Sequence, residues 1–330
     1  MSWRNDEGCD SRTGAGQAPL FQACPELPSL RAEVLTMMPN DTLAAAANTP
    51  RLALVLGSGG VRSVAALGIA DVLAGAGLRP DLIVGCSSGA LFGACIAMGW
   101  SGEQGLEAAM RLWSADLTQK RRWRAYFELV APRFFGFRPD FSLRDAAMIR
   151  GRVERAFGPA RIEDLPIELR VVATETGRGE AVILSQGRVA DAVRASMALP
   201  FMFPSVEIDG RRFTDGVISD PLPVSAALDA TSCITLGFKG ALPRRVDRAS
   251  RLVAQITTMM INNLQQARLG AAAGAGARML HLVLETDPRI KLWETAAMPR
   301  IFEAGRRAAR EQLPAIRELL ESGPRAGLAA

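Results

Sequence analysis

Two strand–turn–helix units in tandem constrain the fold of this chain more than any other feature of its sequence. The apolar run at 52–56 (L-A-L-V-L) has the length of a buried strand, and residues 64–76 follow it with helical periodicity. The same order then repeats, with an apolar strand at 81–84 and a helix at 90–98. Strands that alternate with helices are typical of α/β domains, so we expect a mainly parallel central sheet.

Segments of the same two kinds continue along the chain. Asp209-Gly210, between short runs at 206–208 and 212–214, is a strong signal for a tight β-hairpin. We expect further strands at 168–174, 180–184, 233–238 and 279–284, and further helices at 143–156, 189–196, 251–270 and 300–321.

The composition is that of a globular protein with a disordered start. Hydrophobic residues make up 48% of the chain and charged residues 22%, close to globular averages, so the composition implies neither global disorder nor a membrane protein. Residues 1–50 lack sustained periodicity and are rich in Gly, Pro, Ser and Asp, so we expect a disordered leader there.

Three features favour a cytoplasmic location. The N-terminus lacks the apolar segment of a secretory signal peptide, and the five cysteines fall at unrelated spacings, which favours a reducing compartment and no metal. Residues 82–102 carry no charge, yet Gly85, Gly89, Gly93 and Gly99 favour a buried strand, turn and helix over a membrane span.

The turn after the second predicted strand has the pattern of a nucleophile elbow. Residues 85–89 (G-C-S-S-G) match G-x-S-x-G between a strand and a helix, where Gly85 and Gly89 let the backbone turn sharply enough to expose the serine. We therefore expect Ser87 to be the nucleophile of an acyl transfer, with an ordinary glycine-rich turn as the alternative.

The turn after the first predicted strand, residues 57–63 (G-S-G-G-V-R-S), is a second candidate for chemistry. Free backbone amides at the start of a helix suit a developing oxyanion or a phosphate. A dinucleotide-binding fingerprint would need glycine in place of Arg62, and the G-K-[ST] sequence of a P-loop is missing, so nucleotide binding is disfavoured. Because a cation in a first helical turn opposes the helix dipole, Arg62 predicts a compensating carboxylate or an anionic substrate group.

A serine nucleophile needs a base, and two residues are candidates. His281 is the chain's one histidine, and the order Ser87, Asp215, His281 matches that of α/β-hydrolase triads. It lies in an apolar run at 279–284 that is typical of a core strand, which favours a structural role. Asp215 follows the predicted hairpin, and Gly216 lets the chain turn away, but burial would have to raise the carboxyl pKa above about 3.9 for it to act as the base.

Together these features resemble the patatin-like phospholipase family. The resemblance extends from Leu52 to Ala230 and includes the glycine-rich loop with its basic residue, G-x-S-x-G about 30 residues later, and a distant Asp-Gly. It implies a three-layer α/β/α fold, a Ser–Asp dyad that needs no histidine or cofactor, and cleavage of fatty-acyl esters of phospholipids, lysophospholipids or related lipids. By position it implies Ser87 as nucleophile, Asp215 as base, Gly59, Gly60 and Val61 as oxyanion hole, and Arg62, Gly85, Gly89 and Gly216 in support.

The resemblance also bears on the organisation and origin of the chain. Residues 51–230 correspond to a patatin-like catalytic domain, and we expect residues 231–330 to complete the same α/β domain with further strands and helices. Arginine greatly outnumbers lysine, with three lysines in all, and alanine is abundant, which indicates a GC-rich bacterial genome.

Three positions depart from the family pattern. Ser58 and Ser63 replace glycines of the usual loop, and Val217 replaces the small third residue of the D-G-[GA] motif. A serine at a position that needs φ > 0 would weaken the oxyanion hole. A lipid-binding or regulatory module with impaired activity is therefore one alternative, and an esterase with a Ser-Asp-His triad is another.

Positive charge is concentrated in one part of the chain. Between residues 120 and 155, ten basic residues stand against four acidic ones, which accounts for the whole formal net charge of +5. Aromatic residues accompany the cations over 120–137, a composition that slightly favours peripheral contact with anionic lipid at the inner membrane surface over a solvated helix with its aromatics in the core. Nucleic-acid binding is disfavoured because no recognition motif accompanies the charge.

Overall fold

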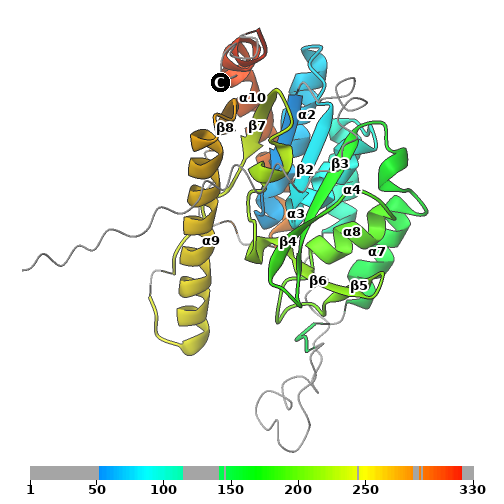
Figure 1. Cartoon of the computed structure of the whole chain (residues 1–330), viewed down its shortest axis with the longest axis vertical. Coiled ribbons are helices and arrows are strands. Elements are labelled where there is room, and N and C mark those ends of the chain that lie inside the picture. The colour runs from blue at the N-terminus through cyan, green and yellow to red at the C-terminus, as the bar shows by residue number, and fades with distance from the viewer. Residues whose placement is uncertain are drawn as a thin grey trace, which may run out of the picture. The chain divides into compact units, whose positions relative to one another are not determined.

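The computed structural model of the chain is built around an eight-stranded sheet (Figure 1). It describes residues 52–113, 141–144, 146–243, 245–284, 290 and 293–321. The strands run in the order β5-β6-β3-β2-β1-β7-β8, and β4 also pairs with β3. Their bounds are β1 Leu52–Leu56, β2 Leu82–Cys86, β3 Glu168–Glu175, β4 Glu180–Leu184, β5 Val206–Ile208, β6 Arg211–Asp215, β7 Ser232–Leu236 and β8 Met279–Leu282.

Most neighbouring strands are parallel. β1 pairs in parallel with β2 and β7, β2 with β3, and β7 with β8. The antiparallel pairs are β3–β4, β3–β6 and β5–β6, all at one side of the sheet. The mainly parallel sheet predicted from the tandem strand–turn–helix units is confirmed.

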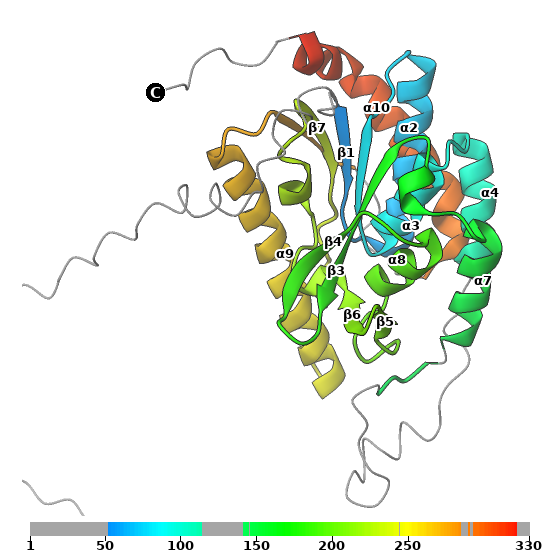
Figure 2. The same cartoon turned by 45° about the vertical axis from the view of Figure 1, so that its right-hand side comes forward.

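Helices cover both faces of the sheet. Figure 2 shows α9 on one face and the remaining labelled helices on the other. The α-helices are α2 Ala65–Gly75, α3 Ser88–Ala97, α4 Gly102–Leu112, α7 Ala147–Phe157, α8 Val189–Ser196, α9 Ala249–Gly274 and α10 Met298–Glu321. Short 3-10 helices are η2 Gly60–Val64, η4 Ile162–Asp164, η5 Gly216–Ile218, η6 Val224–Ala227 and η7 Thr295–Ala297.

The central strands divide their side chains between two cores. In β1, Leu54 and Leu56 belong to the core that includes α2, α3 and α10, whereas Ala53 and Val55 pack in a second core with Ala272 of α9. Successive side chains of a strand point to opposite faces, so a strand covered on both faces is apolar throughout. The three-layer α/β/α arrangement is therefore confirmed.

The predicted hairpin is also confirmed, and it determines where Asp215 lies. Asp209 and Gly210 have φ of 50° and 74°, and a type I′ turn requires positive φ at both central positions. The turn returns β6 antiparallel to β3, and β3 is in turn the neighbour of β2. Asp215, the last residue of β6, is therefore brought close to the end of β2, where Ser87 follows.

Helix α4 was not predicted from the apolar pattern. Its signal is a capping box: the Ser101 hydroxyl accepts from the Gln104 amide at 3.2 Å, and the Gln104 side chain accepts from the Ser101 amide at 3.0 Å. Helix α9 is also longer than predicted, at 249–274 instead of 251–270.

Two predictions fall on parts of the chain outside the described residues: the disordered leader at 1–50 and the basic, aromatic segment at 120–137. Where the structure describes the chain, no helix is both long and apolar enough to cross a membrane. The uncharged stretch 82–102 forms β2, α3 and the start of α4.

Candidate active site

Strand β2 ends in a strained turn that carries Ser87. This residue has φ 56° and ψ −124°, a combination that few non-glycine residues adopt, and it directly precedes helix α3. Its backbone amide donates to Ser196 Oγ at 2.8 Å, and that hydroxyl donates to the Val172 carbonyl at 2.6 Å. The strained turn is thus held by a buried serine of α8 and by the neighbouring strand β3.

Close backbone contacts require the glycines on either side of this turn. A Cβ on Gly85 would lie 2.5 Å from Ala90 Cα, and a Cβ on Gly89 would lie 2.3 Å from the Leu56 carbonyl oxygen. Both distances are shorter than side chains tolerate, and both contacts are with backbone atoms, which move only if the fold moves. The turn therefore packs directly against α3 and the end of β1, which positions Ser87.

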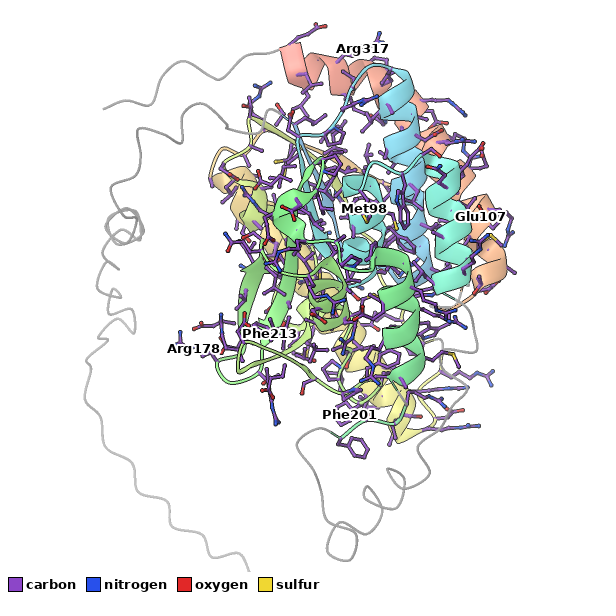
Figure 3. All side chains as sticks on the ribbon, turned by 90° about the vertical axis from the view of Figure 1, so that its right-hand side faces the viewer. Met98, Glu107, Arg178, Phe201, Phe213 and Arg317 are labelled. Carbon is purple, nitrogen blue, oxygen red and sulfur yellow. The ribbon has the colours of Figure 1, made fainter. Side chains whose placement is uncertain are left out.

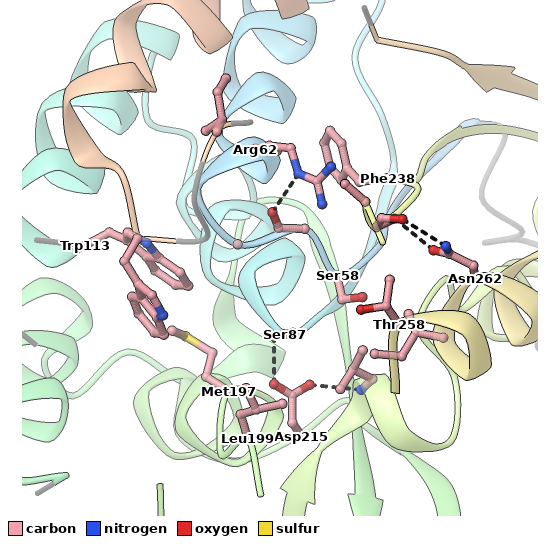
Figure 4. Close-up of a pocket in the computed structure, with 18 of the residues that line it drawn as sticks. Ser58, Arg62, Ser87, Trp113, Met197, Leu199, Asp215, Phe238, Thr258 and Asn262 are labelled. Atoms are coloured by element: carbon pink, nitrogen blue, oxygen red, sulfur yellow. Dashed lines mark hydrogen bonds between the residues drawn. The ribbon is translucent and has the colours of Figure 1, made fainter. Parts of the chain in front are cut away.

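The Ser87 hydroxyl donates a hydrogen bond to Asp215, although 128 positions separate the two residues. The distance from Ser87 Oγ to Asp215 Oδ2 is 2.8 Å, and Asp215 Oδ1 accepts from the Val217 amide at 2.9 Å (Figure 4). A Cβ on Gly216 would lie 2.3 Å from the Val172 carbonyl oxygen, so glycine is needed where the chain passes β3. The carboxylate is therefore oriented toward the serine by backbone contacts.

Burial makes Asp215 a stronger base than an ordinary aspartate. The residue is 2% exposed. Burial raises its pKa to about 7, although hydrogen bonds from the Val217 amide and the Ser87 hydroxyl favour the charged form. A general base is most effective when its pKa lies near the operating pH. The surroundings thus supply the raised pKa that a carboxylate base needs.

The glycine-rich loop after β1 lines the same cavity as Ser87. The Gly59 amide donates to Ser88 Oγ at 3.1 Å, so this amide already has a partner within the protein. Gly60 and Val61 begin the short helix η2, where the first amides have no acceptor within the helix. Of the three residues that the resemblance implies for an oxyanion hole, Gly59 and Gly60 line the cavity and Val61 is fully buried, so Gly60 has the most available amide.

The serines that replace family glycines in this loop fit without backbone strain. Neither Ser58 nor Ser63 is among the described non-glycine residues with positive φ. The Ser63 hydroxyl shares a hydrogen bond with Ser88 Oγ at 2.8 Å and donates to the Gly57 carbonyl at 3.3 Å. Ser63 therefore joins the loop to helix α3, and the weakening expected from a serine at positive φ does not arise.

Arg62 links the loop to the chain that follows β7. Its Nε donates to the Gly59 carbonyl at 3.4 Å, and a terminal nitrogen donates to the Lys239 carbonyl at 3.1 Å. The guanidinium also lies 5.4 Å from the centroid of the Phe238 ring, and burial lowers the pKa of Arg62. The partners that the structure describes for Arg62 are thus carbonyls and a ring, and Arg62 lies in the last turn of η2, where a cation does not oppose the helix dipole.

His281 lies away from the serine. It is on β8 at the edge of the sheet, where its Nδ1 shares a hydrogen bond with Thr235 Oγ1 at 2.8 Å. Three strand spacings separate β8 from β2, or about 14 Å at about 4.8 Å per strand. That separation is far beyond the reach of a hydrogen bond between His281 and Ser87.

An apolar cavity of about 390 Å³ adjoins Ser87 and Asp215. Trp113 stacks on Trp293 with ring centroids 4.6 Å apart, and Phe203 meets Trp293 edge-on at 6.1 Å. The rest of the large apolar lining is Met197, Leu199, Val217, Phe238, Ile261 and Ile290. A mostly apolar lining with a few polar groups at one place is typical of a small-molecule site, and here it suits a hydrocarbon chain.

Helix α9 forms one wall of this cavity, which was not predicted from the sequence. Thr258, Ile261 and Asn262 contribute to the lining, and Figure 4 shows Thr258 close to Ser58 of the loop after β1. Asn262 Oδ1 accepts from the Gly240 amide at 2.8 Å, and Asn262 Nδ2 donates to the Gly240 carbonyl at 3.0 Å. This pair of bonds attaches α9 to the chain that follows β7.

A chain of polar contacts also connects α9 to Asp215. Arg268 donates to the Ser219 carbonyl at 2.9 Å and lies 3.5 Å from the buried Asp220 carboxylate. The Ser219 hydroxyl bonds with Thr174 Oγ1 at 2.7 Å, and Thr174 donates to the Asp215 carbonyl at 2.9 Å. The backbone of Asp215 is therefore tied to both β3 and α9.

Three buried hydroxyls that position the site were also missed by the sequence analysis. Ser88, Ser196 and Thr174 are at most 2% exposed and hold, in turn, the loop after β1, the Ser87 amide and the Asp215 carbonyl. Each adjoins a run of small or apolar residues: 89–97 for Ser88, 171–173 for Thr174 and 197–199 for Ser196. Because buried hydroxyls need hydrogen-bond partners, a polar residue beside such a run is the signal that could have identified them.

Proteins with similar sequences are found among bacteria and fungi. Two uncharacterised NTE family proteins of Mycobacterium tuberculosis are 33% and 30% identical, over 66% and 82% of this chain. Lysophospholipase NTE1 of Phaeosphaeria nodorum is 28% identical over 52% of this chain and 11% of its own length. The alignments span 57% and 47% of the mycobacterial relatives, so this chain matches about half the length of each.

Family membership follows from the sequence model of patatin-like phospholipases, which matches residues 54–228 and so more than half of the chain. Among solved structures, VipD from Legionella pneumophila aligns over 81% of this chain and 67% of that protein, with 14% identity and a TM-score of 0.40, which is too distant to add to the assignment. The matched residues include the loop after β1, the elbow and the Asp-Gly at the end of β6. The chain belongs to the patatin-like phospholipase family.

Proposed function

We propose that this protein is a serine hydrolase that cleaves fatty-acyl esters of phospholipids, lysophospholipids or related lipids. The observation that carries the proposal is the 2.8 Å hydrogen bond from Ser87 Oγ to a buried Asp215 carboxylate whose pKa is raised to about 7. The similarity to Lysophospholipase NTE1 of Phaeosphaeria nodorum, 28% identical over 52% of this chain, also supports lipid-ester hydrolysis.

In the first half of the proposed reaction, Asp215 Oδ2 takes the proton of Ser87 as Ser87 Oγ attacks the ester carbonyl carbon. The carbonyl oxygen becomes an oxyanion and accepts hydrogen bonds from the Gly60 and Val61 amides. When the tetrahedral intermediate collapses, the bond to the alcohol oxygen breaks and the leaving alcohol takes the proton from Asp215. An acyl group remains on Ser87.

The second half repeats these steps with water as nucleophile. Asp215 takes a proton from water as the water oxygen attacks the acyl carbon, and the same amides stabilise the second oxyanion. Collapse then releases the fatty acid and returns the proton to Ser87 Oγ. No redox step or external base is needed, and every proton passes through Asp215.

The cavity favours a long acyl chain as the part of the substrate that it binds. Its aromatic wall of Trp113, Trp293 and Phe203 is apolar, whereas Arg62 lies at the rim of the glycine-rich loop. A hydrocarbon tail would be desolvated against the rings, while a nearby cation favours an anionic group on the alcohol side of the ester. This arrangement supports lipids with a phosphate-containing headgroup over neutral esters.

We also propose that residues 51–230 and 231–330 act as one catalytic unit. Support comes from β7, which pairs with β1 along its whole length, and from α9, which lines the cavity. The cavity would not be complete without this second part of the chain.

A fluorophosphonate probe tests the proposed function directly, because it reacts covalently only with an activated serine hydroxyl. We expect the wild-type chain to be labelled at Ser87, as located by peptide mass spectrometry. Ser87→Ala should abolish labelling and Asp215→Asn should reduce it strongly, whereas His281→Ala should keep most of it. An unlabelled wild type would favour a lipid-binding or regulatory module, and loss of labelling in a folded His281→Ala variant would favour a triad.

A further inference from the structure

The outer face of helix α9 exposes a concentration of apolar side chains. Of the thirteen large apolar residues that are exposed in the described part of the chain, seven lie between residues 242 and 260. Val253 and Met260 are 59% and 66% exposed. We call these seven residues the α9 outer face: Leu242, Val246, Leu252, Val253, Ile256, Met259 and Met260.

This face lies opposite the cavity. Thr258 and Asn262, which line the cavity, are four residues apart and share one side of the helix. Met260 follows Thr258 by two residues, or about 200° around the helix axis. Leu252, Ile256 and Met260 recur at four-residue spacing along the opposite side. Helix α9 thus borders the proposed acyl site with one side and exposes an apolar stripe on the other.

Positive charge borders the apolar face at the start of the helix. Arg245, Arg248 and Arg251 are exposed, whereas Asp247, the one acidic residue in the sequence from 240 to 274, forms an ion pair with Arg251 at 2.9 Å. The first turn of α9 contains no acidic residue, so the positive end of the helix dipole adds to this charge. An apolar stripe beside such a positive region is complementary to an anionic lipid surface.

A strained, exposed phenylalanine lies at the same end of the molecule. Phe201 is 63% exposed and has φ 65°, which is rare for a bulky side chain. Its ring meets Phe141 edge-on at 6.4 Å. Figure 3 shows Phe201 at the lower end of the described chain, which is the end where α9 begins in Figure 1. Strain of this kind at an exposed aromatic residue is typical of a functional position.

We propose that the α9 outer face, with Phe201 and the bordering arginines, docks this protein on an anionic lipid bilayer. The choice of partner rests on the proposed lipid hydrolysis, because docking by α9 would place the wall of the cavity next to the source of substrate. Self-association explains the face less well: α9 contains no Asp or Glu, so a second copy would offer its arginines no opposite charge from this helix. Anionic headgroups would offer negative charge across the whole contact.

Flotation of the full chain with vesicles tests the proposal without any need for catalysis. We would use the Ser87→Ala variant throughout, so that binding is measured whether or not the protein is an enzyme. The Ser87→Ala protein without surface substitutions should co-float strongly with vesicles of phosphatidylcholine and phosphatidylglycerol and weakly with phosphatidylcholine alone. Salt should release it from the anionic vesicles.

Two sets of surface substitutions separate the apolar from the charged contribution. The triple change Leu252→Ser, Val253→Ser and Met260→Ser should lower the partition coefficient about tenfold, because binding scales with the apolar area inserted. The pair Arg245→Gln and Arg248→Gln should lower it about tenfold on phosphatidylglycerol-containing vesicles and little on phosphatidylcholine alone.

Matched controls use residues of similar exposure elsewhere on the surface. Met110→Ser, Ile183→Ser and Leu228→Ser together remove comparable exposed apolar groups, and Arg178→Gln with Arg317→Gln removes the same charge at sites that Figure 3 shows away from Phe201. Both controls should bind as the parent does. The proposal is overturned if controls and α9 variants lose binding equally, if neither loses it, if the parent does not bind, or if the α9 triple change instead dissociates a dimer in light scattering.

Discussion

The two walls of the cavity are built in opposite ways. On the Ser87 side, every residue of β2 and of α3 is buried, and a methyl group at Gly89 would meet backbone at 2.3 Å. On the other side, Gln265 and Ala272 are the buried residues of the 26-residue helix α9. Ser87 therefore lies where the backbone has no room to move, whereas the opposite wall is a helix with few buried residues.

This difference has a physical rationale. Acyl transfer needs Ser87, Asp215 and the loop amides to keep their relative positions, which close packing and second-layer hydrogen bonds achieve. Substrate entry needs the reverse, because elements with few buried contacts open at low free energy. Matched substitutions in α9 and in the elbow test this difference. Equal losses of stability would contradict it, and a larger loss in the elbow would support it.

The largest effect on activity is expected from changes to Ser87 and Asp215, the proposed catalytic pair. Ser87→Ala and Asp215→Asn should each lower ester hydrolysis by about 10³-fold or more, because the first removes the nucleophile and the second its base. Steady-state kinetics on a short-chain nitrophenyl ester would measure this. His281→Ala is the control and should keep most of the activity, since Thr235 is the partner that His281 bonds with.

A matched pair of glycine substitutions compares the walls themselves. Gly89→Ala should lower the free energy of unfolding by about 3 kcal/mol, because its Cβ has no space beside the Leu56 carbonyl. Gly270→Ala in α9 has nothing within 4 Å of its Cβ and should raise the free energy of unfolding by about 0.5 to 1 kcal/mol. Urea denaturation followed by circular dichroism would compare them, and equal destabilisation would remove the contrast between the walls.

The raised pKa of Asp215 predicts how activity depends on pH. The base must be ionised, and its pKa is about 7, so kcat/KM should rise about tenfold per unit as pH approaches 7 and level off above it. A flat profile between pH 5 and 8, after correction for stability, would show that a group other than Asp215 accepts the serine proton.

The same shift predicts a pH-dependent effect on stability. The unfolded chain ionises Asp215 near its ordinary pKa of 3.8, but the folded chain does so near 7, so the wild type loses stability as pH rises through this window. Asp215→Asn lacks this carboxyl group. The Tm of the variant minus that of the wild type should therefore increase from pH 4 to 7 and stay constant above pH 7. A difference that does not change with pH would contradict burial as the cause of the shift.

A smaller effect than that of Gly89→Ala is expected at the polar attachment of α9. Asn262→Ala removes both hydrogen bonds to Gly240 and should lower the free energy of unfolding by about 1 to 2 kcal/mol. Its neighbour Asn263 is exposed, so Asn263→Ala serves as the control and should change stability little. If the two variants unfold alike in urea, α9 is held mainly by other contacts.

Local patterns predicted the elements near the nucleophile well. The strand at 52–56, the hairpin around Asp209-Gly210 and the elbow at 85–89 are each encoded by residues that are neighbours in the chain. Helix α4 was missed because its apolar stripe is narrow, although the capping box at Ser101 marks its start. Patterns of this kind indicate the secondary structure that a segment adopts by itself and with its immediate neighbours in the chain.

Residue patterns alone predict the mainly parallel sheet, the place of Ser87 after β2 and the resemblance to the patatin-like family, because periodicity, turn residues and motifs are read from residues close in the chain. The resemblance implied that Asp215 acts with Ser87, but their contact, the hydrogen bond from the Gly59 amide to Ser88 and the position of α9 beside the cavity are seen only in the folded chain. Those contacts depend on which strands become neighbours in the sheet and on which helix covers its second face. They arise from packing between distant segments, for which no local pattern of residues is a signal.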